Sequence, residues 1–264
     1  MSGHGMRRGV LRPQEAARHL ELRVHPPADA LAGYVEYYWN PRWDLRGRPD
    51  HVQDVLAHPN VHLVLEESGA LVYGVQRAVY RRVLSGRGQA FGVRFRAGAF
   101  RPFAGGPVAE LVDRAVPAAE YFGAGVTALR REVLARDDLE AMAAAVDRFL
   151  LGVLPAEPDP RVAEVGALVD RLTAGPGTPR VDALARELGM PVRRLQRLFA
   201  EYVGASPKWV LRRARLHEAA ARADEGTRPD WPRLAAELGY ADQSHFIRDF
   251  TAATGVPPTH YAAG

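Results

Sequence analysis

The sequence predicts an α+β protein in two parts. A β-rich, barrel-like antiparallel domain with trailing helices is followed by an all-α domain of about seven helices with two helix-turn-helix units. Three observations predict this: apolar and polar residues alternate between about 20 and 103, the spacing becomes helical after 117, and a helical segment repeats after 184. The length of 264 residues fits domains of roughly 100–200 residues each. We place the boundaries at 1–154, a linker at 155–160, and 161–264.

Strand patterns dominate the amino-terminal part. The stretch 34–39 is aromatic and β-prone, and alternation follows around residues 61–65 and 91–95. Turn-forming residues at 67–69 and 86–88 predict hairpin connections between neighbouring strands. These features predict an antiparallel sheet or a small barrel.

Helical spacing replaces this pattern from residue 117 to 154, and a break is expected near Asp137 and Asp138. The proline-rich stretch that follows indicates a linker. Asp159 is placed to cap the next helix, with Pro160 at its first position.

An internal repeat carries the functional signal. The hexapeptide LARELG at 184–189 recurs as LAAELG at 234–239, and GASP at 204–207 corresponds to GVPP at 255–258. Each copy predicts a helix, a glycine turn and a second helix that crosses the first. In the first copy Val192, Leu195 and Phe199 recur at the spacing of a buried helix face. In the second copy Asp242 is the expected N-cap, and Phe246 and Phe250 are expected to face inward.

The opposite faces of the second helices carry side chains that can read DNA. Arg can bond bidentately to guanine and Gln to adenine, while further cations pair with phosphates. Between the copies, the predicted helix 207–223 carries basic residues, of which Arg215 has an equally plausible structural role. The predicted DNA contacts are Arg193, Arg194, Gln196, Arg197, Lys208, Arg212, Gln243, Ser244, His245 and Arg248.

The basic charge of the chain is concentrated around the first copy. The 35 basic and 31 acidic residues give 35 − 31 = +4 in total. Residues 191–215 hold seven basic residues against Glu201, a local surplus of 7 − 1 = +6. We therefore expect the first helix-turn-helix unit to dominate the attraction to phosphate.

Residues 162–261 resemble the DNA-binding region of the AraC/XylS family of bacterial transcription regulators. The similarity is most specific in LGYADQSHFIRDF at 238–250 and GVPPTHY at 255–261. It implies two recognition helices in successive major-groove segments, about one turn (~34 Å) apart. Ile247 stands where the family usually has a polar residue, so base contacts of the second helix are expected to be fewer.

The amino-terminal part more weakly resembles the β-rich sensor domains of such regulators, through FGVRFRAGA at 91–99. That resemblance implies effector sensing and dimerisation, with 117–154 as the dimer contact. Its aromatic residues either belong to the core, the favoured interpretation, or line an effector pocket. The candidate effector residues are Tyr37, Trp39, Trp43 and His62.

The function predicted is a sequence-specific, non-enzymatic transcription regulator controlled by a small-molecule effector. Its partners would be double-stranded promoter DNA and, for an activator, RNA polymerase. With no cysteine, thiolate nucleophiles, disulfides and cysteine metal sites are excluded. No cofactor, metal site, membrane segment or signal peptide is expected, so a cytoplasmic location is predicted. One alternative is a ligand-independent regulator whose β domain only dimerises. Another is a metal-dependent enzyme fused to a DNA-binding module, which requires His51, His58 and His62 to converge.

Overall fold

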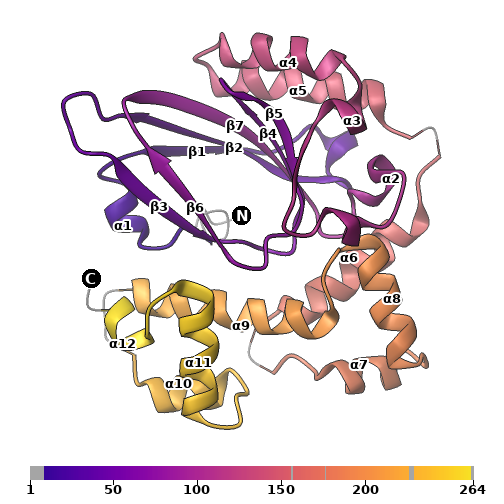
Figure 1. The fold of residues 1–264 in the computed structure, drawn as a ribbon. Coiled ribbons are helices and arrows are strands. Elements are labelled where there is room, and N and C mark those ends of the chain that lie inside the picture. Colours follow the sequence, from indigo (N-terminus) through magenta and orange to yellow (C-terminus); the bar gives the residue numbers. More distant parts are fainter. Residues whose placement is uncertain (1–8, 156, 176, 226–228, 263–264) are drawn as a thin grey trace.

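The computed structural model describes residues 9–155, 157–175, 177–225 and 229–262, and its amino-terminal part contains two antiparallel sheets (Figure 1). The larger sheet has the strand order β1-β2-β7-β4-β5-β8. Its strands are β1 (Glu21–His25), β2 (Val35–Asp44), β7 (Arg87–Phe95), β4 (His62–Glu66), β5 (Gly69–Tyr73) and β8 (Ala115–Pro117). The smaller sheet pairs β3 (His51–Leu56) with β6 (Val79–Leu84).

One of the two predicted hairpins is confirmed and the other is wrong. The turn after Glu66 joins β4 to its antiparallel neighbour β5. Gly86, with φ of 57°, instead carries the chain from β6 in the small sheet to β7 in the large one. A glycine permits this left-handed corner. The local pattern at 86–88 indicated a turn but not which strands it joined.

The large sheet packs one face against two helices, α4 (Gly125–Leu134) and α5 (Leu139–Val153). Leu63, Phe91 and Val93 from the sheet share a buried core with the apolar faces of these helices. Asp138 caps α5, because its carboxylate accepts the Ala141 N–H at 2.9 Å. The predicted break between two helices is therefore confirmed.

Short elements close the ends of this part. They are α1 (Pro13–Ala16), α2 (Arg101–Ala104) and α3 (Ala119–Phe122), with 3-10 turns η1 (Asp29–Leu31) and η2 (Val108–Leu111). Each of these elements is only three or four residues long.

Among the described residues, the carboxy-terminal part has seven helices, as predicted. They are α6 (Pro160–Thr173), α7 (Val181–Glu187), α8 (Val192–Tyr202), α9 (Pro207–Asp224), α10 (Trp231–Glu237), α11 (Gln243–Thr254) and α12 (Pro258–Tyr261). Asp159 caps α6 through the Arg161 N–H at 2.9 Å, with Pro160 in the first turn as expected. Ala156, in the predicted linker, and Pro176 lie outside the described residues.

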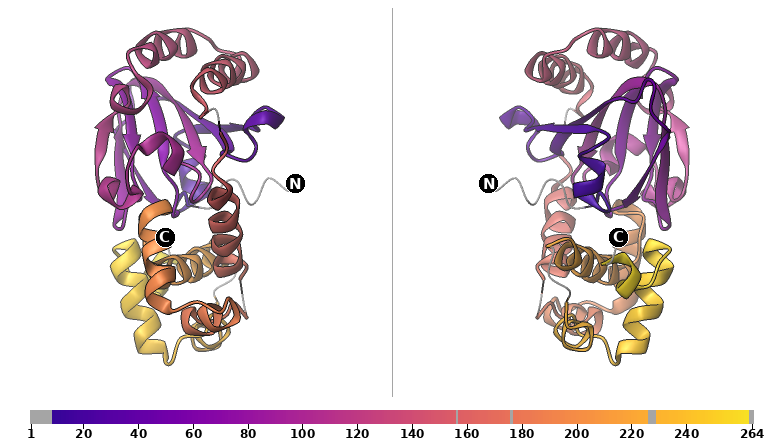
Figure 2. Two further views of the ribbon diagram at one scale, coloured as in Figure 1. Left: turned by 90° about the vertical axis from the view of Figure 1, so that its right-hand side faces the viewer. Right: turned by 90° about the vertical axis from the view of Figure 1, so that its left-hand side faces the viewer.

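The two parts are in contact through shared cores. Leu11 and Leu56 from the amino-terminal part are buried with α9, α10 and α11, and Val75 and Ala99 are buried with α6, α7 and α8. Helix α9 consequently lies directly beneath β3 and β6, whereas α4 and α5 lie at the opposite end of the molecule (Figures 1 and 2). A proline-rich connection in the sequence does not separate the two parts in space.

Candidate DNA-binding surface and effector pocket

The repeat folds into two helix-turn-helix units, α7–α8 and α10–α11. They lie near opposite ends of α9 (Figure 1). Both turns use a glycine with positive φ: 62° at Gly189 and 73° at Gly239. A side chain at Gly239 would also meet the Arg215 guanidinium, whose Nη2 would lie 3.1 Å from the added Cβ. Glycine is therefore favoured there by its conformation, and a larger residue would also have to displace the Arg215 guanidinium.

The two turns share the same hydrogen bonds. Met190 N–H donates to the Ala185 carbonyl and Tyr240 N–H donates to the Ala235 carbonyl, both at 3.0 Å. These bonds close the first helix of each unit in the same way. Figure 2 (left) places the second helices, α8 and α11, on the same side of α9. The repeat seen in the sequence is thus a repeat of structure.

Helix α8 carries its four predicted DNA-contact residues on the exposed face, while Leu195 and Phe199 are fully buried. The exposed residues are Arg193, Arg194, Gln196 and Arg197. The prediction that Val192 is buried is wrong, since it is 36% exposed. Val192 is the first residue of α8, and the residues of this helix that are buried are Leu195, Phe199 and Tyr202. The solvent-facing side of α8 therefore combines cations, an amide and one apolar residue.

Helix α11 exposes its predicted contact residues in a similar way. Asp242 caps the helix, because its Oδ1 accepts the His245 N–H at 2.7 Å. Gln243, Ser244, His245 and Arg248 are exposed, as the sequence predicted. Ile247 is partly buried and packs against the core of the second unit. The apolar side chain of Ile247 therefore serves packing, and the exposed face of α11 has one polar side chain fewer.

Helix α9 contributes fewer free cations than the sequence suggested. Lys208 is exposed. Arg212 Nη2 lies 2.6 Å from the Oδ1 of buried Asp249, and Arg215 Nη1 donates to the Gly239 carbonyl at 3.2 Å. Arg213 is buried, and this burial lowers the pKa of its guanidinium to about 10. The local surplus of +6 thus overstates the charge available to DNA around α9.

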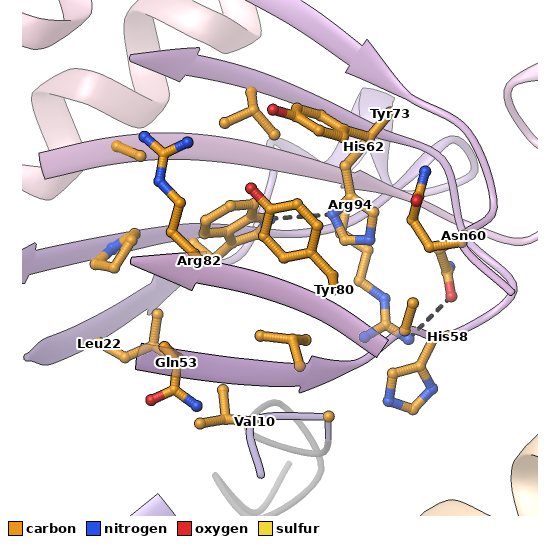
Figure 3. Close-up of a pocket in the computed structure, with 18 of the residues that line it drawn as sticks. Val10, Leu22, Gln53, His58, Asn60, His62, Tyr73, Tyr80, Arg82 and Arg94 are labelled. Carbon is orange, nitrogen blue, oxygen red and sulfur yellow. Dashed lines mark hydrogen bonds between the residues drawn. The ribbon is translucent and has the colours of Figure 1, made fainter. Parts of the chain in front are cut away.

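A cavity of about 220 Å³ lies between the large sheet and the β3–β6 pair (Figure 3). Alternation along β2 explains its position, because successive side chains of a strand point to opposite faces. Tyr38 enters the core under α5, whereas Tyr37 and Trp39 face the cavity. All four candidate effector residues line it: Tyr37, Trp39, Trp43 and His62. Core packing, the favoured interpretation of the aromatic residues, is right for Tyr38.

Two tryptophans lie across glycines of the adjacent strand. Trp39 pairs with Gly92 and Trp43 with Gly88 in the β2–β7 register. An added Cβ at Gly92 would lie 1.9 Å from Trp39 Cε2, and one at Gly88 would lie 2.4 Å from Trp43 Cζ2. These glycines let the indole rings approach the β7 backbone closely, and both tryptophans line the cavity.

His62 is held neutral within this pocket. Its Nδ1 accepts the Trp39 indole N–H at 3.2 Å (Figure 3). Burial and, to a smaller extent, the nearby Arg94 guanidinium together lower the pKa of His62 to about 3. A neutral imidazole that accepts at Nδ1 carries its proton on Nε2. The Nε2–H belongs to a half-buried ring that lines the cavity.

The charged groups of the pocket are paired with protein groups. Arg94 Nε lies 2.9 Å from Glu36 Oε2, Nη1 donates to the Tyr37 hydroxyl at 2.9 Å, and Nη2 donates to Asn60 Oδ1 at 3.1 Å. Arg82 donates to the buried carboxylate of Glu66.

The sequence pattern predicted Tyr37 and His62 but not other polar residues that line the cavity, among them Asn60, Glu66, Arg82 and Arg94. His62 and Arg94 are direct cross-strand neighbours in the β4–β7 pair, which was the available clue. Strand register, however, depends on pairing between distant segments of the chain.

The three histidines considered as metal ligands have different partners. His51 stacks on His19 with ring centroids 4.1 Å apart, His58 stacks on His217, and His62 bonds to Trp39. Among the described residues no group of three or more metal-ligating side chains is found. The condition for the metal-dependent enzyme is therefore not met at these histidines.

Comparison with known proteins finds a separate match in each part of the chain. Residues 184–264 match a helix-turn-helix domain family, and residues 23–117 match a domain of unknown function, DUF6597. The carboxy-terminal region is therefore a helix-turn-helix domain, and the resemblance predicted from its sequence is confirmed. No curated protein matches the chain. Over the described residues, no helix has the length and apolar character needed to span a bilayer.

Several solved structures are similar to the chain at low identity. The carboxy-terminal domain of AraT, a response regulator from Geobacillus stearothermophilus, is 22% identical over 38% of this chain and 83% of that one, with a TM-score of 0.33. An apo variant of ToxT from Vibrio cholerae is 12% identical over 86% and 97% of the two chains, with a TM-score of 0.44. Wild-type ToxT bound to unsaturated fatty acid is 11% identical over 92% and 91%, with a TM-score of 0.39.

Proposed function

We propose that the protein is a sequence-specific DNA-binding transcription regulator whose DNA affinity is controlled by a small molecule in the β-domain pocket. The observation that carries the first half is the duplicated helix-turn-helix unit. Its second helices, α8 and α11, expose the side-chain types that read the major groove. Both helices lie on one side of α9 (Figure 2), so one face of a duplex can meet both.

The roles of the individual side chains follow from their positions. Gln196, Arg197, Gln243 and Arg248 are the proposed base-reading residues, because they project from the exposed faces of the two recognition helices. Arg193, Arg194, Lys208 and Ser244 are proposed to bind phosphate. Arg212 and His245 have a second role, since both lie near the buried carboxylate of Asp249.

Effector control is supported by contacts between the two parts of the molecule, one of which joins the pocket wall to α9. His58, in the pocket wall, stacks on His217 of α9. Arg213 of α9 donates to the Arg77 carbonyl, just before β6. Arg101 and Glu201 form an ion pair at 2.5 Å between α2 and the end of α8. A ligand that favours one arrangement of these contacts would bias the positions of both units.

The helices α4 and α5 are the proposed dimer contact. They lie at the end of the molecule opposite the DNA-binding helices (Figure 1), and Leu151 of α5 is an exposed apolar residue. A dimer through this end would leave both DNA-binding surfaces free. Sedimentation of the wild type and of Leu151→Glu tests this arrangement. The wild type should sediment as a dimer and the variant as a monomer.

Salt dependence of DNA binding tests the proposed surface. Affinity for duplex DNA should fall linearly with salt on a log–log plot, because phosphate neutralisation releases counterions. Removing Arg193, Arg194 and Lys208 together should reduce the magnitude of this slope by about 2–3. An unchanged slope would mean that the phosphates contact another surface of the protein.

A further inference from the structure

We infer that the pocket binds an uncharged aromatic molecule carrying a hydrogen-bond acceptor, which His62 engages through its Nε2–H. This inference rests on the proposed effector pocket and names the class of ligand that it takes. Three features of the pocket carry it: the pairing of its charges, the shape and size of its walls, and the single ring donor of His62.

The charge pairing disfavours an anionic ligand. The Arg94 guanidinium donates from Nη1 and Nη2 to Tyr37 and Asn60, and its charge is paired with Glu36, whose Oε2 lies 2.9 Å from Nε without hydrogen-bond geometry. Arg82 is neutralised by Glu66. A carboxylate entering the pocket would lose its hydration and would have to break one of these pairs to gain a cationic partner. A positively charged ligand meets the same difficulty, because both carboxylates are occupied.

The walls fit a planar ring. Trp39 and Trp43 occupy the space beside Gly92 and Gly88, and both indoles line the cavity. Further aromatic surface comes from Tyr37, Tyr73 and Tyr80. The rings of Tyr73 and Tyr80 meet edge to face, with their centroids 5.8 Å apart. Stacked and edge-to-face contacts between rings are favourable beyond their buried area. A cavity of about 220 Å³ exceeds the ~150 Å³ that suffices for benzene, so it accommodates one ring with a substituent.

The polar requirement follows from His62. Its Nδ1 accepts the Trp39 indole N–H, and the half-buried ring lines the cavity with its Nε2–H still available. A ligand oxygen or ring nitrogen would give this donor a partner, and a hydrogen bond formed away from water is favourable. The ligand should therefore place a carbonyl or a similar acceptor at His62 and its ring against the indole of Trp39.

Three probes of equal size test the inference on the full-length protein: acetophenone, benzoate and cumene. They share a benzene ring and have the same number of non-hydrogen atoms, but carry a neutral acceptor, an anion and no polar atom, respectively. Dissociation constants can be measured through quenching of the pocket tryptophans and by calorimetry. We expect acetophenone to bind about 3- to 10-fold more tightly than cumene, as one hydrogen bond provides, and benzoate to bind most weakly. Equal or tighter binding of benzoate, or no binding of any probe, would overturn the inference.

Variants of His62 test which residue supplies the donor. His62→Phe keeps a ring but removes the donor, so the preference for acetophenone over cumene should disappear. His62→Gln retains both an acceptor for Trp39 and a donor, and should restore part of that preference. His260→Phe on exposed α12 is the matched control and should leave both affinities unchanged. A preference that persists in His62→Phe would contradict the assignment. Acetophenone binding without any change in DNA affinity would instead contradict effector control while leaving the ligand class intact.

Discussion

The imidazole rings of His58 and His217 lie parallel, with their centroids 3.6 Å apart and an interplanar angle of 10°. His58 belongs to the wall of the β-domain pocket, and His217 lies in the middle of α9, the helix between the two helix-turn-helix units. The His217 Nε2 is also 3.4 Å from the Ala57 carbonyl. This stacked pair therefore joins the proposed effector site directly to the DNA-binding part.

Removing this contact should weaken the link between the two parts. We expect His217→Ala to lower the free energy of unfolding by about 0.5–1.5 kcal/mol, as the loss of a buried ring pair does. Urea denaturation measures this change. His260→Ala on the exposed surface of α12 is the control and should leave stability unchanged. Equal stability of His217→Ala and wild type would show that the stack contributes nothing to the contact.

Gly92 should be essential to the pocket because Trp39 occupies the space of its missing side chain. Gly92→Ala would place a Cβ 1.9 Å from the indole, so the ring must move into the cavity at a cost of about 1–3 kcal/mol in stability. Binding of acetophenone should be lost. Gly152→Ala in α5 meets no atom within 4 Å and should be neutral or stabilising by up to about 1 kcal/mol. Normal probe binding in Gly92→Ala would refute the described position of Trp39.

Arg197 is expected to read a base. Arg197→Ala should weaken binding to the preferred site by about 1–3 kcal/mol and relax the preference at one position. Arg148→Ala removes the same charge from α5, at the opposite end of the molecule, and should leave DNA affinity unchanged. Competition binding against sites with single base changes measures both effects. An equal loss on every sequence would show that Arg197 contacts phosphate alone.

Variants of Arg212 and Asp249 distinguish the structural role of Arg212 from a role in DNA binding. Arg212→Ala leaves the buried Asp249 carboxylate without its 2.6 Å partner, so stability should fall by about 1–3 kcal/mol. Adding Asp249→Asn removes the unpaired charge and should recover most of the stability. If Arg212 also binds phosphate, the double variant will still bind DNA more weakly than Asp249→Asn alone. Full recovery of DNA affinity would make Arg212 a purely structural residue.

The burial of His62 predicts a pH dependence of stability. Its pKa in the folded protein, about 3, lies below the ~6.5 of an unfolded histidine. Below about pH 6.5 the unfolded state therefore binds more protons, and stability is lost as pH falls. Below about pH 6.5, the free energy of unfolding of the wild type should fall, relative to that of His62→Gln, by up to about 1.4 kcal/mol per pH unit. Identical profiles from pH 7 to 5 would indicate a His62 that is protonated equally in both states.

Local pattern predicted much of this fold, and its failures have a common cause. The repeat, the caps at Asp159 and Asp242 and the exposed faces of α8 and α11 depend on residues close in sequence. Arg212 and Arg213 are adjacent, yet only Arg213 is buried beneath the β domain. No helical periodicity in α9 reveals a neighbouring domain.

The pocket shows the same limit. Tyr38 and Trp39 are both aromatic, and which one enters the core depends on the placement of α5 behind the large sheet. Arg94 meets His62 only through the register of β4 and β7. The sequence indicated the aromatic strand correctly, but the polar lining of the cavity follows from pairing between segments far apart in the chain.

Selection of bound duplexes from a randomised pool by the full-length protein tests the central claim most directly. The account predicts enrichment of a site with two preferred blocks about one helical turn (~34 Å) apart, one for α8 and one for α11. Arg197→Ala and Arg248→Ala should each relax a different block. Enrichment of no sequence at any salt concentration, despite binding, would contradict the assignment of α8 and α11 as recognition helices.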